Sequence, residues 1–203
     1  MARWQKTSLD VQMSFNGEDM AQLTALLKDT PKKIPAILAR VINRGLNTVR
    51  THVTRIVAKE LGLKYKTAGY RVRRIKATKE NLTGDVEAGR WGWRYMAFRP
   101  IQTATGVKVK MRRSKMLKHA FLARMESGHP GVFLREGKAR LPIREQFTAS
   151  PTEAITAAGG VLSAKQAGAE MLSKRLKHEI DRVLKRRYRA EYGDEVGTLY
   201  ATH

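Results

Sequence analysis

The residues whose types could support catalysis or metal binding are few in this sequence, and they are scattered. The closest acidic pairs, Asp85/Glu87 and Asp194/Glu195, are predicted to lie in a strand and in a tail, unlike the clustered carboxylates of nucleases and glycosidases. Cysteines, Gly-x-Ser-x-Gly elbows and Walker loops are absent. We therefore expect no enzyme, no cofactor and no metal site. No two histidines stand at the spacing of metal ligands; they are His52, His119, His129, His178 and His203.

The sequence is strongly basic, with 40 Lys and Arg against 18 Asp and Glu and a formal net charge of +22. Charge of this sign and density attracts polyanions, and phosphate is the commonest polyanionic group in cells. A nucleic-acid partner is the hypothesis that we favour. A basic surface that is merely solvated is the alternative.

The positive charge is concentrated in two stretches that contain no acid. Residues 64–79 contain seven Lys or Arg, and residues 88–125 contain ten. Like charges on neighbouring strands repel, so such stretches need an outside partner or acids from elsewhere in the fold. We predict that the DNA-proximal side chains come from these stretches; they are Arg71, Arg73, Arg74, Lys108, Lys110, Arg112, Arg113 and Lys115.

The first part of the chain is predicted to contain a strand, a short helix and a long helix. Apolar and polar residues alternate over 9–15, which is typical of a half-buried strand, and the spacing over 19–28 indicates a short helix. Apolar residues then recur every three or four positions from about Pro35 to Leu61, and Gly62 suits a left-handed helix cap. The basic residues on the opposite face are either solvated or in contact with a polyanion; they are Arg40, Arg44, Arg50, Arg55 and Lys59.

The middle of the chain is predicted to form an antiparallel sheet. Val107 and Val109 alternate with Lys108 and Lys110, so this strand should have one dry face and one basic face. The sheet is expected to be twisted and able to close toward a small barrel. Its strands are expected over 72–75, 82–88, 107–111, 120–125 and 131–135, with a hairpin turn at 103–106.

Aromatic residues interleave with arginine just before this hairpin. Rings in such a pattern could stack on nucleic-acid bases. Their strand-like spacing favours instead a sheet core, in which alternate rings are buried and the rest lie at an interface. The rings belong to Trp91, Trp93, Tyr95 and Phe98.

The C-terminal part is predicted to be helical. A weak Ala/Gly-rich helix follows Ser150-Pro151, a hinge is expected at Gly159-Gly160, and Ser163 fits the N-cap of a final helix that runs to about Arg189. The whole pattern predicts an α+β fold with a long N-terminal helix, a central antiparallel sheet and a C-terminal helix. We divide the chain into an N-terminal strand and short helix (1–30), a core domain (31–155), and a C-terminal helix and tail (156–203).

No apolar run approaches the ~20 residues that a membrane span requires, and the first ten residues lack the apolar stretch of a signal peptide. We therefore expect a soluble chain that is made in the cytoplasm and has no membrane partner.

The most distinctive segment, residues 127–147, reads Ser-Gly-His-Pro-Gly-Val-Phe-Leu-Arg-Glu-Gly-Lys-Ala-Arg-Leu-Pro-Ile-Arg-Glu-Gln-Phe, and Ser150-Pro151 follows it. It resembles the signature of the phage minor tail protein Z family of tail-completion proteins. In that signature a Gly-His-x-Gly-Val-Phe strand precedes a basic turn, Leu-Pro-Ile-x-Glu and a Ser-Pro. The likeness covers about residues 30–155. The matching positions in the segment are Gly128, His129, Gly131, Phe133, Arg140, Leu141, Pro142, Ile143 and Glu145.

Gln146 and Thr148-Ala149 depart from the family pattern, in which a small apolar residue and Gly-Pro are expected, so the chain resembles a divergent member. The residues of the segment suit structure rather than catalysis. The glycines around Pro130 predict a tight turn into a strand, and residues 141–143 are expected to dock as an extended segment. Glu145 is expected to pair with a nearby arginine.

The resemblance implies a structural protein at the head-proximal end of a phage tail, which completes the tail, helps heads join and positions the DNA. It implies a ring of identical subunits, with a hexamer as the first guess, around a channel that DNA crosses. Its neighbours would be the tail terminator, the tail tube and the head–tail connector. The protein would be assembled in the host cytoplasm and then reside in the virion, in the neck region of the tail. The alternatives are a free, sequence-nonspecific nucleic-acid-binding protein and a DNA enzyme, and the scarcity of acids argues against the enzyme.

Overall fold

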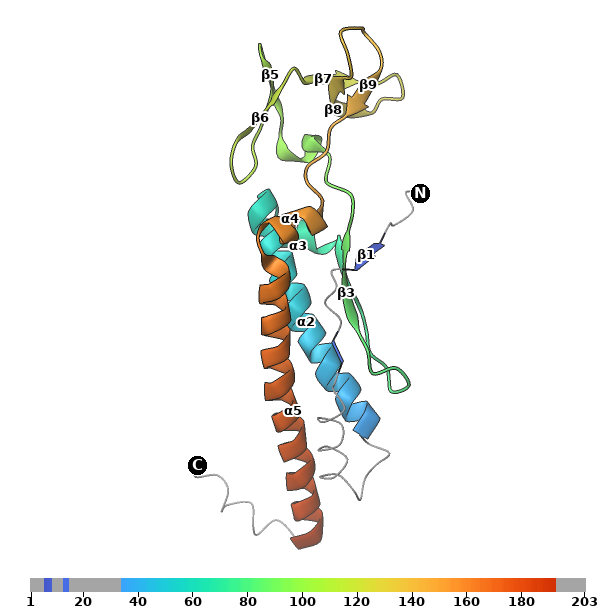
Figure 1. Ribbon diagram of the computed structural model, residues 1–203, viewed down its shortest axis with the longest axis vertical. Coiled ribbons are helices and arrows are strands. Elements are labelled where there is room, and N and C mark those ends of the chain that lie inside the picture. The colour runs from blue at the N-terminus through green and yellow to red at the C-terminus, as the bar shows by residue number, and fades with distance from the viewer. Residues whose placement is uncertain (1–5, 9–12, 15–33, 193–203) are drawn as a thin grey trace. The chain divides into compact units, whose positions relative to one another are not determined.

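The computed structural model describes residues 6–8, 13–14 and 34–192 (Figure 1). Two compact units each combine segments that are far apart in the sequence. We call Met1–Val11, Arg50–Arg74 and Val86–Ala164 the strand unit, and Gln12–Val49, Ile75–Asp85 and Lys165–His203 the helix unit. The predicted helix over 19–28 lies outside the described residues, and of the predicted strand over 9–15 only residues 13 and 14 are described.

Helix α2 runs over Ile34–Leu61 for 28 residues and confirms the predicted long helix. Gly62 ends it with a φ of 66°, and the Leu63 amide donates to the Ala58 carbonyl at 2.9 Å. A hydrogen bond from residue 63 back to residue 58, across a left-handed glycine, is typical of the Schellman cap at a helix C-terminus, and this is the cap that the sequence predicted. One face of the helix is fully buried, because its apolar residues recur at helical spacing; that face includes Leu38, Ile42, Leu46, Val49, Val53 and Val57.

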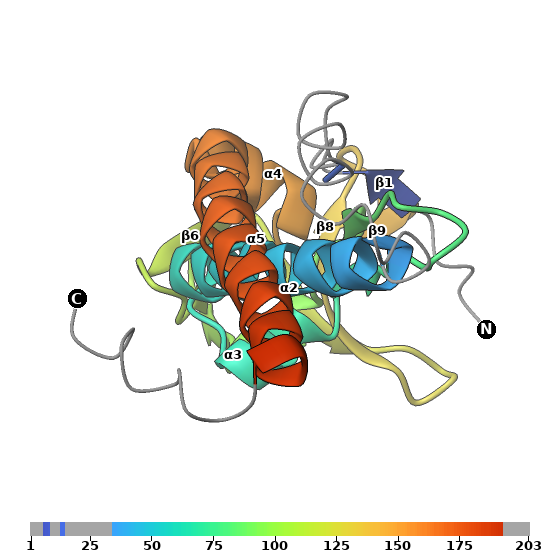
Figure 2. The same ribbon diagram turned by 90° about the horizontal axis from the view of Figure 1, so that it is seen from below.

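In the helix unit, the first half of α2 packs against α5, which runs over Gly160–Tyr192 (Figures 1 and 2). The close approach uses small residues: a Cβ added at Gly45 would lie 3.3 Å from Leu172, and one added at Gly168 would lie 2.7 Å from Val49. At the edge of this contact Arg40 pairs with Glu179 at 3.2 Å. The apolar contact joins Ile34, Ile37, Leu38 and Val41 of α2 to Leu172, Leu176, Ile180 and Val183 of α5.

The predicted N-cap of the last helix is wrong by four residues. Helix α5 already begins at Gly160, and the Ser163 hydroxyl lies inside it, where it donates to the Gly160 carbonyl at 3.1 Å. The Ser-Pro pair instead caps α4 (Pro151–Ala157). The Ser150 hydroxyl accepts from the Glu153 amide at 3.2 Å, and the Glu153 carboxylate accepts from the Ser150 amide at 2.8 Å.

The described strands form three small three-stranded sheets, in which the pairs β1–β3, β4–β5, β5–β6, β7–β8 and β8–β9 are antiparallel. The predicted α+β fold is therefore confirmed, and no closed barrel occurs within the described residues. One sheet has the order β1-β3-β2, from Lys6–Ser8, Asp85–Gly89 and Val72–Ile75. The second has the order β4-β5-β6, from Ile101–Thr103, Gly106–Val109 and Lys115–Lys118. The third has the order β7-β8-β9, from Phe121–Arg124, Pro130–Arg135 and Ile143–Glu145.

The aromatic segment is core, as expected, but it is not a strand. The rings of Trp93, Tyr95 and Phe98 are buried, whereas Trp91 is 56% exposed. The chain turns through a 3-10 helix, η2 (Tyr95–Phe98), and Arg99 caps its C-terminal end with a left-handed φ of 48°. Two short bonds hold the segment in place: the Trp93 amide donates to the Thr148 hydroxyl, and the Thr148 amide donates to the Trp93 carbonyl, each at 2.9 Å.

The remaining described helix is α3 (Tyr65–Gly69), which lies in the basic stretch after α2. Its buried residue is Ala68. None of the helices in the described ranges has a stretch apolar enough to span a membrane.

Candidate nucleic-acid interface

The β4-β5-β6 sheet has one dry face and one basic face, as predicted for its middle strand. Val107 and Val109 are fully buried on the inner face. Lys108 lies on the outer face, where the register sets it between Ile101 of β4 and Met116 of β6. Lys118 stands opposite Gly106 on the same face, because side chains two residues apart share a side of a strand. All four of these outer-face side chains are exposed.

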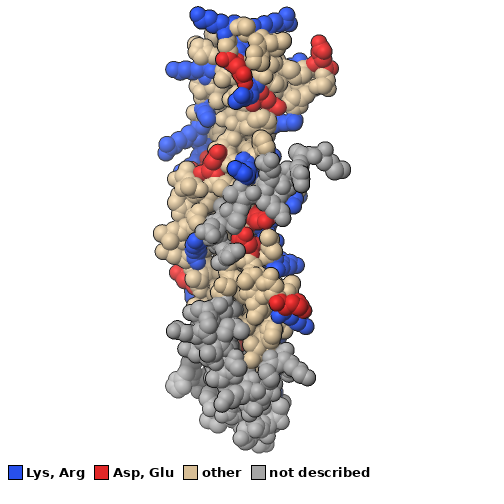
Figure 3. Space-filling view, turned by 45° about the vertical axis from the view of Figure 1, so that its right-hand side comes forward, with Lys and Arg blue, Asp and Glu red and all other residues tan. Residues whose placement is uncertain are grey.

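The cations predicted to approach DNA fall into two groups. Lys108, Lys110 and Arg113 are exposed, and within the described part of the chain no hydrogen bond or ion pair engages their side chains. Lys118, which the sequence reasoning missed, joins them. We call these four residues the outer basic group. Figure 3 shows Lys and Arg side chains projecting at the end of the strand unit where β5 to β9 lie in Figure 1.

The other predicted cations are engaged within the fold. Arg112 pairs with Glu60 at 2.5 Å, at the cap of α2. The Lys115 ammonium lies on the inner face, 3.1 Å from the Tyr95 hydroxyl. Arg73 and Arg74 also take part in interactions within the chain.

Arg71 is also held within the fold. Its guanidinium donates to the Trp91 carbonyl at 2.6 Å and lies 4.9 Å from the centre of the Trp93 ring. Partial burial lowers the pKa of this guanidinium below its ordinary value. Arg71 therefore joins two segments and is not a mobile surface charge.

The basic residues predicted for one face of α2 also include both engaged and exposed side chains. The Arg50 guanidinium donates to the Val72 carbonyl at 3.1 Å and to the Gly69 carbonyl at 3.3 Å, so it ties α3 to the helix. Arg44 and Arg55 are exposed.

His129 lies at the centre of a polar cluster that joins the distinctive segment to the aromatic segment. Its Nδ1 is 3.2 Å from an Arg94 nitrogen, and its Nε2 is 3.1 Å from the Glu145 carboxylate. Arginine can only donate, so Nδ1 accepts and Nε2 carries the proton that is donated to Glu145. The expected partner arginine of Glu145 is Arg94, whose Nε lies 3.7 Å from the carboxylate.

Backbone conformation and close packing explain why glycine occupies two positions of the distinctive segment. The turn between β7 and β8 requires a left-handed residue at Gly128, whose φ is 79°. A Cβ at Gly131 would lie 2.7 Å from the Phe133 ring, so the missing side chain leaves room for that buried ring. Phe133 in turn packs near Phe121, with ring centres 6.2 Å apart.

The loop after β8 is held by its own bonds. The Arg135 guanidinium donates to the Arg140 carbonyl, the Glu136 amide donates to the Pro142 carbonyl at 3.1 Å, and Arg144 pairs with Glu136 at 2.8 Å. Of the segment 141–143, which was expected to dock in extended form, Ile143 begins β9 and pairs with Arg135 of β8, whereas Leu141 is 67% exposed.

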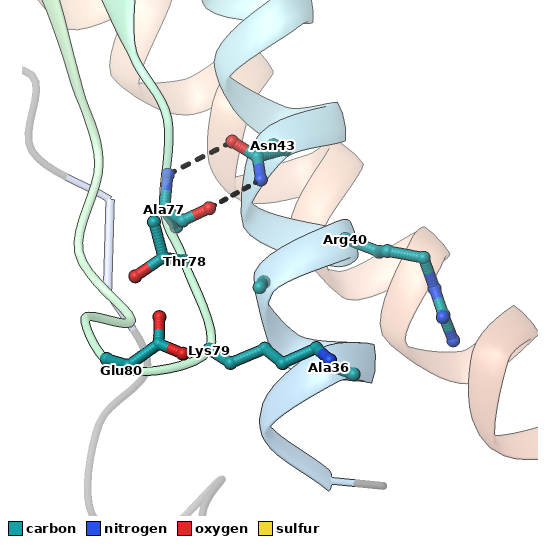
Figure 4. Close-up of a pocket in the computed structure, with 8 residues that line it drawn as sticks. Ala36, Arg40, Asn43, Ala77, Thr78, Lys79 and Glu80 are labelled. Carbon is teal, nitrogen blue, oxygen red and sulfur yellow. Dashed lines mark hydrogen bonds between the residues drawn. The ribbon is translucent and has the colours of Figure 1, made fainter.

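A hollow of about 480 Å³ in the helix unit lies between α2 and the segment 77–80 (Figure 4). The Asn43 side chain forms two hydrogen bonds with the backbone of Ala77. Its amide nitrogen donates to the Ala77 carbonyl at 2.9 Å, and its oxygen accepts from the Ala77 amide at 3.1 Å. Across the described residues, no three His, Asp or Glu side chains gather as metal ligands. The hollow is lined by Ala36, Ala39, Arg40, Asn43, Ala77, Thr78, Lys79 and Glu80.

Replacing Glu145 with alanine should lower the free energy of unfolding by about 1–3 kcal/mol, because the His129 N–H and Arg94 lose a largely buried acceptor. Glu145→Gln should lose less, since an amide oxygen still accepts from His129. Urea unfolding of the full chain measures both values. Glu126→Ala, at an exposed position in the β7–β8 turn, is the control. Equal stability of Glu145→Ala and the control would show that the cluster does not stabilise the fold.

A family model described as prophage minor tail protein Z (GPZ) matches residues 18–189. No curated protein and no solved structure gives a significant match to the chain.

Proposed function

Because the chain belongs to the prophage minor tail protein Z family, we propose that it completes the head-proximal end of a phage tail, assists head–tail joining and positions the DNA there. The family is one of structural tail proteins, and membership makes the chain a component of the virion tail. The outer basic group supports the more specific proposal that the chain lies next to DNA in the tail.

The observation that carries the proposal is the exposed and unengaged state of Lys108, Lys110, Arg113 and Lys118. They lie in a stretch, residues 88–125, that contains no acid. Acids from elsewhere in the described residues do not pair with these four side chains either, in contrast to Arg112 with Glu60. Phosphates along a DNA backbone would neutralise them and release the counterions condensed on the DNA, and such contacts do not depend on base sequence.

A ring of identical subunits, with six as the first expectation, would line a channel with copies of the outer basic group. A net charge of +22 on each subunit opposes close packing of free copies. DNA in the channel, and contacts with the tail terminator, the tail tube and the head–tail connector, would offset this repulsion.

The test is the location of the chain in purified particles. Immunogold labelling of an epitope-tagged chain should mark one end of isolated tails, the end that joins the head. Label along the whole tube or at the distal tip would contradict the proposal. A chain that is absent from tails, yet binds DNA alone with strong salt dependence, would be the free nucleic-acid-binding protein instead.

A further inference from the structure

Large aromatic rings are exposed on neighbouring segments of the strand unit: Tyr65 is 45% exposed, and the two most exposed are Tyr70 and Trp91. Tyr70 is 68% exposed and Trp91 is 56% exposed, whereas the nearby rings of Trp93, Tyr95 and Phe98 are buried. The aromatic segment thus separates into a core part and a part that meets solvent. Exposed Trp and Tyr rings on adjoining segments are typical of a contact surface.

The backbone holds the two segments together. Tyr70 directly precedes Arg71, whose carbonyl accepts from the Gly89 amide at 2.9 Å. The Arg71 guanidinium donates to the Trp91 carbonyl at 2.6 Å. These two bonds set the residues that carry the rings on adjacent stretches of chain. The rings are therefore presented by an ordered framework.

The surroundings of the rings are basic. Lys66 and Arg90 are exposed close to the rings in sequence, and residues 64–79 contain seven Lys or Arg and no acid. An unpaired nucleic-acid strand offers both complements, phosphates for the cations and open base faces for the rings. A duplex offers only the phosphates, because its bases are stacked on one another.

We infer that Tyr70 and Trp91 form a stacking platform for single-stranded nucleic acid, with the surrounding cations on its backbone. The inference rests on the proposed placement of the chain beside phage DNA, and it assigns unpaired bases to a surface separate from the outer basic group. The occupant is thus a single-stranded segment of DNA, and a protein partner is the rival occupant.

The test compares the full-length chain with a Tyr70→Ala/Trp91→Ala variant. Fluorescence anisotropy measures its affinity for labelled oligothymidylate of about 12 nucleotides and for a duplex of the same length. The variant should bind the single strand at least about tenfold more weakly and bind the duplex within about twofold of the parent chain. Tyr70→Phe/Trp91→Phe keeps both rings and should restore single-strand affinity.

Phe147→Ala removes another exposed ring of the strand unit and is the matched control, with circular dichroism as the check on folding. Unchanged single-strand affinity of the Tyr70→Ala/Trp91→Ala variant would overturn the inference, as would an equal loss on both probes. Normal single-strand affinity together with failure to enter tails would identify a protein interface instead. Absence of duplex binding, with ring-dependent single-strand binding intact, would remove the duplex contact of the proposed function and leave the platform standing.

Discussion

A phage whose chain carries Lys108→Glu, Lys110→Glu, Arg113→Glu and Lys118→Glu should yield at least about 100-fold fewer infectious particles. Each change replaces a cation that would neutralise a phosphate with an anion that repels it, and affinity for DNA depends steeply on the number of such contacts. All four side chains are exposed, so the fold should be retained. Arg112 is left unchanged because its ion pair with Glu60 stabilises the strand unit.

Plaque titre divided by the number of particles seen by electron microscopy measures this effect. The matched control reverses the same number of exposed cations on α2 and α5, at Arg44, Arg55, Lys174 and Lys177. The control has the same net charge, so it separates the position of the charge from its total. Equal titres of the two variants, or normal infectivity of the first, would show that the outer basic group does not contact DNA in the particle.

The Gly92→Ala variant should be destabilised by about 3 kcal/mol or more, which lowers Tm by roughly 6–12 °C. A Cβ at this buried position would lie 1.9 Å from the Thr148 carbonyl oxygen and 2.7 Å from the Thr148 carbonyl carbon. The obstacle is backbone, and it cannot move without breaking the bonds between Thr148 and Trp93. The clash therefore disturbs the link between the aromatic segment and the N-cap of α4.

Calorimetry of the full chain measures the change in Tm. Gly137→Ala is the matched control, because nothing lies within 4 Å of the added Cβ and its backbone is not left-handed. The control should stay within about 0.5 kcal/mol of the parent chain. A Gly92→Ala variant as stable as the control would show that residues 92 and 148 do not approach as described.

Local patterns predicted much of the fold because they report on one element at a time. The three- and four-residue spacing predicted α2, and Gly62 predicted its end. Alternation of valine and lysine predicted the two faces of β5. Strand β6 was missed, since Lys115–Lys118 does not alternate and its pairing depends on β5. The start of α5 was placed too late because Ser163 suits an N-cap, and the tight contact of Gly160 with Ile56 is not visible in the local sequence.

The sequence predicted which stretches supply the cations of the candidate site, but it did not predict which of these cations are engaged within the fold. Runs of basic residues marked the stretches that carry Lys108, Lys110 and Arg113. The same runs could not show that Arg112 pairs with Glu60, that Lys115 reaches Tyr95 or that Arg71 lies over Trp93, because each contact joins segments at least 20 residues apart. The partner of Glu145 was expected to be an arginine, yet only the fold identifies Arg94 and adds His129.

Cryo-electron microscopy of the head–tail junction tests most directly whether the surplus charge faces DNA. We predict copies of this chain around the channel, with Lys108, Lys110, Arg113 and Lys118 turned toward the DNA density. A junction in which the chain is present but these side chains are buried against protein, or point away from the channel, would contradict this prediction.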